Sequence, residues 1–242
     1  MLDYSHMTGT HDLRLGVLAF GDSISNGGGE LQWGVALQSW ALWVARGLGL
    51  PFTSYAFDGS RARDVVESQL AVFEEVSANP DAGYQLGCLY IGVNDVRDAD
   101  FDREAFERDY RFALQYLTSR CERVLTLTIP LDLGRPRTGA RVVQANEVID
   151  RVATELGALL VDLSDFRARN LVMADRVHPT AFGQIAIAER ALAVLARDGV
   201  PTRVAPRSVI VFETTWWGRL RGDATYVYRY LKGIVRGLVG AG

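Results

Sequence analysis

A serine, a histidine and an aspartate in this chain have the types and spacing needed for nucleophilic acyl transfer. Ser23 stands in Gly21-Asp22-Ser23, directly after an apolar run, and His178 stands in Asp175-Arg176-Val177-His178-Pro179. A serine hydroxyl is a weak nucleophile at neutral pH, so it needs a neighbouring base and a third group that orients that base. Asp175 can reach back to the His178 imidazole and fix its tautomer. We expect Ser23, His178 and Asp175 to be the catalytic set.

Of the three histidines, only His178 lies in a segment whose sequence pattern is typical of folded structure. His6 and His11 lie in an N-terminal stretch without apolar periodicity, whereas His178 precedes an apolar-periodic run that begins after Pro179. Proline restricts the residue before it to extended backbone values, which favours placing His178 at a loop-to-helix junction. Taken alone, the fragment from Asp175 to His178 is equally consistent with an ordinary surface loop.

Acyl transfer also requires hydrogen-bond donors for the oxyanion of the tetrahedral intermediate. Three candidates are the backbone N–H of Ser23, the backbone N–H of Gly59 and the side-chain amide of Asn94. Each has a simpler interpretation by itself, since Gly59 is typical of a turn and Asn94 of a turn or helix cap. Asp22, Asp95 and Asp162 are likewise predicted to brace turns or cap helices.

The elements that must position these residues alternate between short apolar runs and longer helical-period segments. This alternation is typical of βα units on a parallel sheet, and it predicts a three-layer α/β/α sandwich. The predicted strands are residues 13–20, 52–57, 86–91, 124–129 and 158–163, and the predicted helices are residues 37–48, 64–77, 102–119, 139–156 and 180–196. Trp40 and Trp43 fall on one helical face and are expected in the core.

Ligands in open α/β sheets bind outside the carboxyl ends of the strands. The blocks containing Ser23, Gly59 and Asn94 follow the first, second and third predicted strands, so all three are expected at one sheet edge. We divide the chain into an N-terminal extension, residues 1–12, a hydrolase domain, residues 13–200, and a C-terminal basic aromatic extension, residues 201–242.

The ordered blocks Gly-Asp-Ser, Gly, Gly-x-Asn-Asp and Asp-x-x-His make residues 13–196 resemble the SGNH or GDSL hydrolase family. The resemblance implies a flavodoxin-like five-stranded parallel sheet, with Ser23 attacking an ester carbonyl. It also implies an oxyanion hole made by Ser23, Gly59 and Asn94, and no metal or organic cofactor. Ile24 stands where many members have leucine, which is a conservative change. Ser23 is not in the Gly-x-Ser-x-Gly elbow of the larger α/β-hydrolases.

The expected function is hydrolysis of small or acetyl carboxylic esters through an acyl-enzyme. An acyltransferase using the same residues and a catalytically silent ligand-binding module remain alternatives, because fold alone does not fix function. A dinucleotide site at Gly27-Gly28-Gly29 is disfavoured, since no second glycine follows Gly21 at the Gly-x-Gly-x-x-Gly spacing. This glycine run is expected to border the active site, with Trp33 lining it.

Composition limits the kinds of partner and the cellular location that are expected. A net charge of −3 and a pI near 5.7 give no basic footprint for nucleic acid, so none is expected as a partner. The two cysteines, Cys88 and Cys121, lie in apolar runs and are interpreted as buried thiols. With no signal-peptide pattern at the N-terminus, these features favour a cytoplasmic protein.

The C-terminal segment from Trp216 to Gly242 differs from the rest of the chain. It carries five basic residues against one acidic residue, and Ser208 to Phe212 before it is interpreted as a short strand. An amphipathic helix is expected, with an apolar side formed by Tyr226, Tyr228, Tyr230, Leu231, Ile234, Val235 and Leu238. Such a helix suits packing on the domain, a dimer contact, or an anionic membrane surface.

Overall fold

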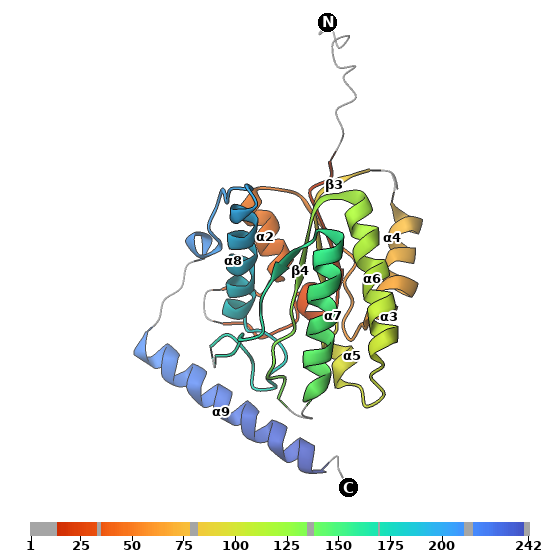
Figure 1. The fold of residues 1–242 in the computed structure, drawn as a ribbon. Coiled ribbons are helices and arrows are strands. Elements are labelled where there is room, and N and C mark those ends of the chain that lie inside the picture. The colour runs from red at the N-terminus through yellow and green to blue at the C-terminus, as the bar shows by residue number, and fades with distance from the viewer. Residues whose placement is uncertain are drawn as a thin grey trace, which may run out of the picture.

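Five parallel strands form the centre of the molecule in the computed structural model (Figure 1). The structure describes residues 14–32, 35–77, 82–134, 138–168, 170–210 and 215–239, so the extension of residues 1–12 and Trp33 lie outside the described residues. The strands run in the order β2-β1-β3-β4-β5. Their bounds are β1 (Val17–Gly21), β2 (Phe52–Ser54), β3 (Tyr84–Tyr90), β4 (Cys121–Leu127) and β5 (Leu159–Val161). Each predicted strand is present, which confirms the predicted parallel sheet.

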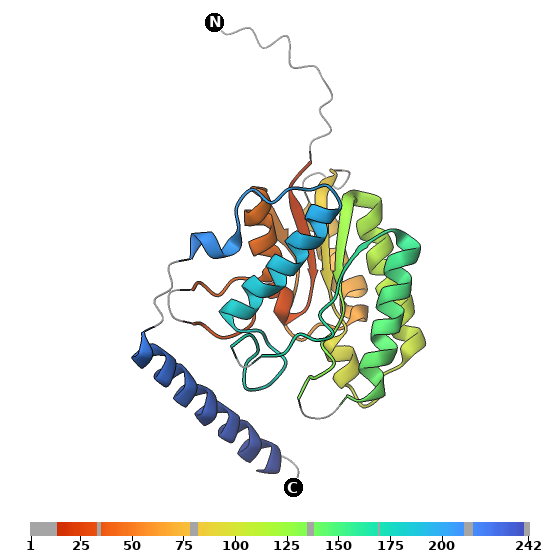
Figure 2. The same ribbon diagram turned by 60° about the vertical axis from the view of Figure 1, so that its left-hand side comes forward.

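Helices cover both faces of this sheet (Figures 1 and 2). One face carries the packed pair α2 (Trp40–Leu48) and α8 (Ala181–Arg197). The other carries α4 (Leu70–Val76), α6 (Arg103–Arg120) and α7 (Ala140–Leu156). The predicted three-layer α/β/α sandwich is therefore confirmed.

Two details of the helices differ from the sequence prediction. The segment predicted as one helix over residues 64–77 is three pieces, namely α3 (Ala62–Asp64), a π-helical turn η1 (Val65–Gln69) and α4. A π turn adds one residue to the helical repeat, which shifts the face presented beyond it. Two short helices, α1 (Ser23–Asn26) and α5 (Val93–Arg97), follow β1 and β3. They are too short to give a periodic apolar signal.

Apolar side chains fill the space between the layers. β1 is fully buried along its length, and β3 is buried at all but one of its positions. Trp40 and Trp43 lie in the core, as predicted. Cys88 and Cys121 are free and buried, which agrees with their interpretation as buried thiols, and burial raises the pKa of Cys121 to about 12.

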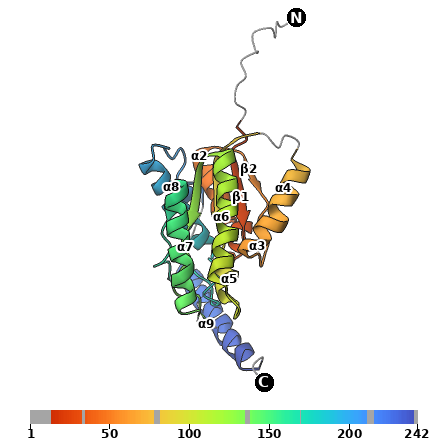
Figure 3. The ribbon, with the colours of Figure 1, turned by 45° about the vertical axis from the view of Figure 1, so that its right-hand side comes forward.

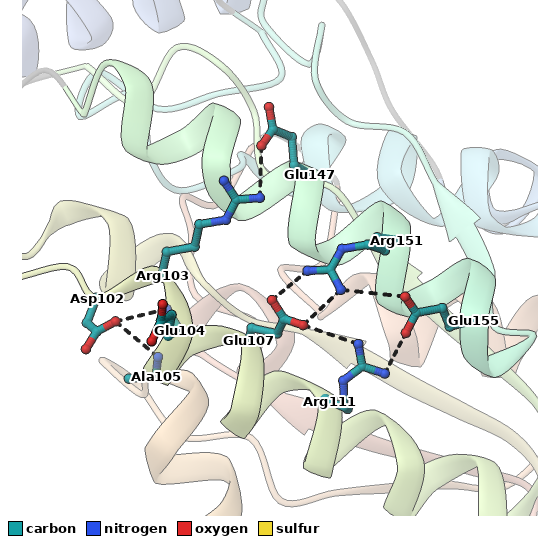
Figure 4. Close-up of polar contacts among 9 residues, drawn as sticks. All are labelled: Asp102, Arg103, Glu104, Ala105, Glu107, Arg111, Glu147, Arg151 and Glu155. Atoms are coloured by element: carbon teal, nitrogen blue, oxygen red, sulfur yellow. Dashed lines mark hydrogen bonds and ion pairs between the residues drawn. The ribbon is translucent and has the colours of Figure 1, made fainter.

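Charged side chains on α6 and α7 form a network on the outer surface (Figure 4). Glu107 accepts hydrogen bonds from Arg111 and Arg151, and Arg111 also pairs with Glu155 at 2.7 Å. The hydrogen bond from Arg151 is the main reason that the pKa of Glu107 lies below its usual value. Exposed ion pairs of this kind contribute little to stability, so the buried contacts between the two helices hold them together.

The C-terminal segment forms a short 3₁₀ helix, η2 (Pro206–Val209), and a long helix, α9 (Trp216–Val239). The predicted strand over 208–212 is wrong at Ser208, Val209 and Ile210, and residues 211 and 212 lie outside the described residues. Pro206 starts the helical turn, and the Ser208 N–H and hydroxyl both bond to the Ala205 carbonyl. Among the described helices, none is both long and apolar enough to cross a bilayer. Figure 3 shows α9 at the same end of the domain as α5.

Candidate active site

Ser23 lies at the sharp turn where β1 ends and α1 begins. Gly21, the last residue of β1, has a φ of 149°. A Cβ atom at Gly21 would fall 2.3 Å from the Tyr90 carbonyl oxygen, so this position requires glycine. Asp22 then caps α1 by accepting a hydrogen bond from the Ile24 N–H at 2.9 Å. The strand and the cap together fix Ser23 as the first residue of α1, at the carboxyl edge of the sheet.

A hydrogen-bonded chain joins Ser23 to His178 and Asp175. Ser23 Oγ lies 2.9 Å from His178 Nε2, and His178 Nδ1 lies 2.7 Å from Asp175 Oδ2. The other carboxylate oxygen of Asp175 accepts from the backbone N–H groups of Val177 and His178. Ser23 and His178 are 155 residues apart in the sequence, and the fold brings them into contact.

The loop that carries His178 is held from both sides. The Met173 N–H donates to the His178 carbonyl, and Thr180 caps α8 by accepting from the Gly183 N–H. Arg176 has a φ of 58°, which is an uncommon backbone conformation for a residue with a side chain. Its guanidinium bonds to Asp132 at 3.0 Å, in the loop after β4. These contacts orient the imidazole independently of Ser23.

Contact between the half-buried side chains of His178 and Asp175 raises the pKa of His178 and lowers that of Asp175. The hydrogen bond to Asp175 raises the pKa of His178, although burial acts against this. Burial alone would raise the pKa of Asp175, but hydrogen bonds from His178 and Val177 outweigh it and leave that pKa below its usual value. Asp175 is therefore charged near neutral pH, where it stabilises a positive charge on the imidazole.

Gly59 and Asn94, the other two candidates, are joined to each other through one loop. Asn94 Nδ2 donates to the Ser60 carbonyl at 2.9 Å, which uses one of its two amide hydrogens. Gly59 has a φ of 79°, but a Cβ atom there would have no neighbour within 4 Å. The backbone conformation, and not lack of space, therefore favours glycine at this position. Asp95 accepts from the Ala62 N–H and holds the same loop.

Two buried glutamines that the sequence prediction missed hold the Ser23 turn. Gln69, at the end of η1, accepts from the Gly21 N–H at 3.0 Å and donates to the Gly21 carbonyl at 2.7 Å and to Ser60 Oγ at 3.0 Å. Gln184, on α8, donates to the carbonyls of Ile24 and Gly28. A glutamine inside an otherwise apolar helical segment is the sequence signal that points to such a residue, since buried polar groups require partners.

Asp22 is the most unusual titratable group near the site. It is fully buried, and its Oδ2 atom has no hydrogen-bond partner among the described residues. Burial raises its pKa to about 7, against the opposing effect of the Ile24 N–H. Burial likewise raises the pKa of Asp95 to about 6. Both carboxyls act as turn braces, as does Asp162, which accepts from Thr128 Oγ1 and the Ser164 N–H.

Two rival kinds of site lack supporting geometry in the described part of the chain. No group of three or more metal-ligating side chains gathers among the described residues. The glycine run Gly27-Gly28-Gly29 follows the short helix α1 and does not open a longer one, and the Gly28 N–H is bonded to the Ser23 carbonyl. A phosphate site at the start of a helix would need those N–H groups free.

The family model described as "GDSL-like Lipase/Acylhydrolase family" matches residues 19–185. The chain belongs to the GDSL-like lipase/acylhydrolase family. This GDSL-family chain is therefore a carboxylic ester hydrolase by class. A search of curated proteins finds no match.

Solved structures resemble this GDSL-family member along most of its length. An acetylxylan esterase from Geobacillus stearothermophilus matches with a TM-score of 0.57 and 20% identity, over 76% of this chain and 96% of that one. An alpha/beta hydrolase enzyme from the metagenome of Lake Arreo, Spain, matches with a TM-score of 0.58 and 21% identity, over 76% of this chain and 97% of that one. At these identities the likeness shows the fold, which is the predicted SGNH hydrolase fold.

Proposed function

We propose that this protein hydrolyses small or acetyl carboxylic esters with Ser23 as nucleophile, His178 as general base and Asp175 as the residue that orients the base. The observation that carries the proposal is the chain of hydrogen bonds from Ser23 Oγ through the imidazole to Asp175, 2.9 and 2.7 Å long. In this arrangement the base lies within reach of the hydroxyl proton, and its other nitrogen is held by a carboxylate.

The reaction has two steps that use the same imidazole. His178 Nε2 takes the Ser23 proton while Oγ attacks the ester carbonyl, and the imidazolium then protonates the leaving alcohol. An acyl-enzyme remains on Ser23. Water, deprotonated by His178, attacks this acyl group; the bond between the acyl carbon and Ser23 Oγ breaks, the acid leaves, and the imidazolium returns its proton to Oγ. The backbone N–H groups of Ser23 and Gly59 and the Asn94 amide are assigned to the oxyanion in both steps.

The preference for an acetyl or other small acyl group rests on the activity of one structural neighbour. That neighbour is the acetylxylan esterase from Geobacillus stearothermophilus, and its likeness to this chain supports a shared fold. Two buried free thiols and an overall net charge of −3 support the accompanying proposal of a cytoplasmic protein that acts on small molecules and not on nucleic acid.

Hydrolysis of p-nitrophenyl esters, from acetate to long acyl chains, tests the function. We expect Ser23→Ala to lower kcat by at least about a thousandfold and to prevent labelling by a serine-directed phosphonate. Ser25→Ala is the matched control, because Ser25 lies in the same turn but bonds to Trp40 Nε1 and not to His178. Hydrolysis that survives Ser23→Ala would rule out this nucleophile.

The same assay separates the alternatives. An acyltransferase would give more ester product than acid when an alcohol acceptor is added. A folded protein that neither hydrolyses any ester of the series nor reacts with the phosphonate would be a ligand-binding module. The intact hydrogen-bonded chain favours the hydrolase over that module.

A further inference from the structure

Helix α9 exposes an apolar face that the described part of the chain leaves uncovered. Its exposed apolar side chains retain between 39% and 71% of their accessible surface; they are Trp216, Trp217, Leu220, Val227, Tyr228, Tyr230, Leu231 and Val235. At 3.6 residues per turn, all of these positions except Tyr230 fall within an arc of about 120°. A contiguous apolar arc of this size marks an interaction surface and not a set of scattered surface residues.

Tyr226 shows which way this arc faces. It lies outside the arc, is half-buried, and lines a cavity of about 270 Å³ together with Met173, Arg176 and Asp132. Those residues belong to the loop of Asp175 and His178 and to the loop after β4. The predicted apolar side of α9 therefore needs one correction, because Tyr226 lines this cavity while Tyr228, Leu231 and Val235 are exposed. The side chains of Ile234 and Leu238, also predicted on that side, lie outside the described part of the structure.

Charge indicates what covers the arc. The segment from Trp216 onward carries five basic residues and one acidic residue, in a chain whose net charge is −3. Arg221 and Lys232 are exposed and lie at one margin of the apolar arc. A basic helix is repelled by a second copy of itself, whereas an anionic lipid surface attracts it.

The domain presents further apolar side chains at the same end. Leu31, Phe57 and Leu131 are each at least 47% exposed, and they lie in the loops after β1, β2 and β4, at the carboxyl edge of the sheet. Figures 1 and 3 place α9 at this end, together with α5, which follows the carboxyl end of β3. The exposed apolar surface of α9 and that of the active-site edge therefore lie at one end of the molecule.

We propose that α9 is an interfacial helix that binds an anionic lipid bilayer with its apolar arc and turns the active-site edge toward that surface. The paired Trp216 and Trp217 suit the boundary between headgroups and acyl chains, where indole rings are favoured. Arg221 and Lys232 then lie at the level of the anionic headgroups. Uptake of an ester substrate at the membrane surface rests on the proposed function. Bilayer binding by α9 does not.

Flotation with vesicles tests the binding without catalysis. The full chain carrying Ser23→Ala is mixed with vesicles of phosphatidylcholine alone or with one third phosphatidylglycerol. We expect binding to the anionic vesicles only, and weaker binding as salt rises. Leu231→Glu should weaken binding at least about tenfold, and Lys232→Glu roughly fivefold. Val76→Glu is the matched control, because Val76 is an exposed apolar residue at the end of α4, at the opposite edge of the sheet, and should leave binding unchanged.

Tryptophan fluorescence and circular dichroism complete the experiment. In a chain that also carries Trp33→Phe, insertion should shift the emission of Trp216 and Trp217 to shorter wavelength, while the buried Trp40 and Trp43 give a constant background. Unchanged helix content in each variant shows that the fold is retained. Absence of binding to anionic vesicles at low salt, or equal binding by Leu231→Glu, would overturn the proposal. So would a dimer, seen by ultracentrifugation, that Leu231→Glu dissociates, because a second copy would then cover the arc. Esterase activity of the unmodified Ser23 chain on a soluble ester is measured separately.

Discussion

At the residue scale, the environment of each ionisable group decides its role. Asp175 accepts three hydrogen bonds and stays charged, while Asp22 is buried with one oxygen unpartnered and a pKa near 7. The same side-chain type thus serves as the charged partner of His178 in one place and as a turn brace with a raised pKa in the other. The pH dependence of ester hydrolysis tests the role of Asp175, and the pH dependence of folding stability tests the role of Asp22.

The pH profile of ester hydrolysis should report His178. Only the neutral imidazole can accept the Ser23 proton, so kcat/KM should fall as pH drops through the raised pKa of His178. Asp175→Asn removes the main cause of that increase, so the acid limb should move to lower pH while kcat falls by up to about four orders of magnitude. Asp132→Asn is the control, since Asp132 bonds to Arg176 in the same loop. An acid limb that stays in place in Asp175→Asn would contradict this assignment.

Folding stability should report Asp22. Its pKa is about 7 in the folded chain and 3.8 in an ordinary setting, so the folded state binds more protons between these values. The free energy of unfolding should therefore decrease as pH rises from about 4 to 7. Asp22→Asn keeps the oxygen that accepts from Ile24 but carries no charge. We expect it to be more stable than the parent above pH 7, by a few kcal/mol at most.

Urea unfolding at a series of pH values between 4.5 and 8 measures this difference. The curve for Asp22→Asn should be flatter than that of the parent, and the two should converge toward acid pH, where Asp22 is protonated. Parallel curves across the range would show that Asp22 has no raised pKa.

At the element scale, the π turn η1 links the loops of the candidate site. It places Gln69 against both backbone groups of Gly21 and against the Ser60 hydroxyl, so it connects the Ser23 turn to the loop of Gly59. Asn94 extends the connection to the loop after β3 through the Ser60 carbonyl. Three loops from three neighbouring strands are thus held by side chains, in addition to the sheet itself.

Gln69→Leu should disturb this connection. It leaves the Gly21 N–H and the Ser60 hydroxyl without their partner, while the Gly21 carbonyl still accepts from the Phe57 N–H, so we expect a loss of about 2–5 kcal/mol in the free energy of unfolding. kcat should fall while KM changes little, because Gln69 positions the Ser23 turn and does not line a binding surface. Gln85→Leu is the matched control, since Gln85 accepts from the Gly16 N–H at the opposite end of β1. Gln85→Leu should lower stability and leave kcat unchanged; an equal effect of both substitutions on kcat would reduce Gln69 to a purely structural role.

At the scale of the whole molecule, a densely packed domain is followed by a helix whose described side chains are mostly exposed. β1 and β3 are buried at the centre of the sheet, whereas the apolar side chains of α9 are mostly exposed. Regions with few buried contacts open at low free energy, and an isolated helix is only marginally stable in water. Stability should therefore differ strongly between these two parts.

Hydrogen exchange measured by mass spectrometry should show this difference. Amide hydrogens of α9 should exchange at least about a hundredfold faster than those of β1, β3 and β4, whose exchange requires global unfolding. Anionic vesicles should slow the exchange of α9 and leave the strands unaffected. Protection of α9 equal to that of β3 without vesicles would show that another surface already covers it.

The sequence by itself determined the layered parallel sheet and the family, because both leave local signals. Continuous apolar runs mark the buried strands. The blocks Gly-Asp-Ser, Gly, Gly-x-Asn-Asp and Asp-x-x-His occur in order along the chain, and those that follow strand ends lie at one edge of the sheet because the strands are parallel. The contact between Ser23 and His178 is not visible in local sequence, and neither are the roles of Gln69 and Gln184. These depend on backbone groups supplied by segments far apart in the chain. The position of Tyr226 is a further example. Composition predicts that α9 has an apolar side, but only tertiary packing decides which of its aromatic rings faces the domain.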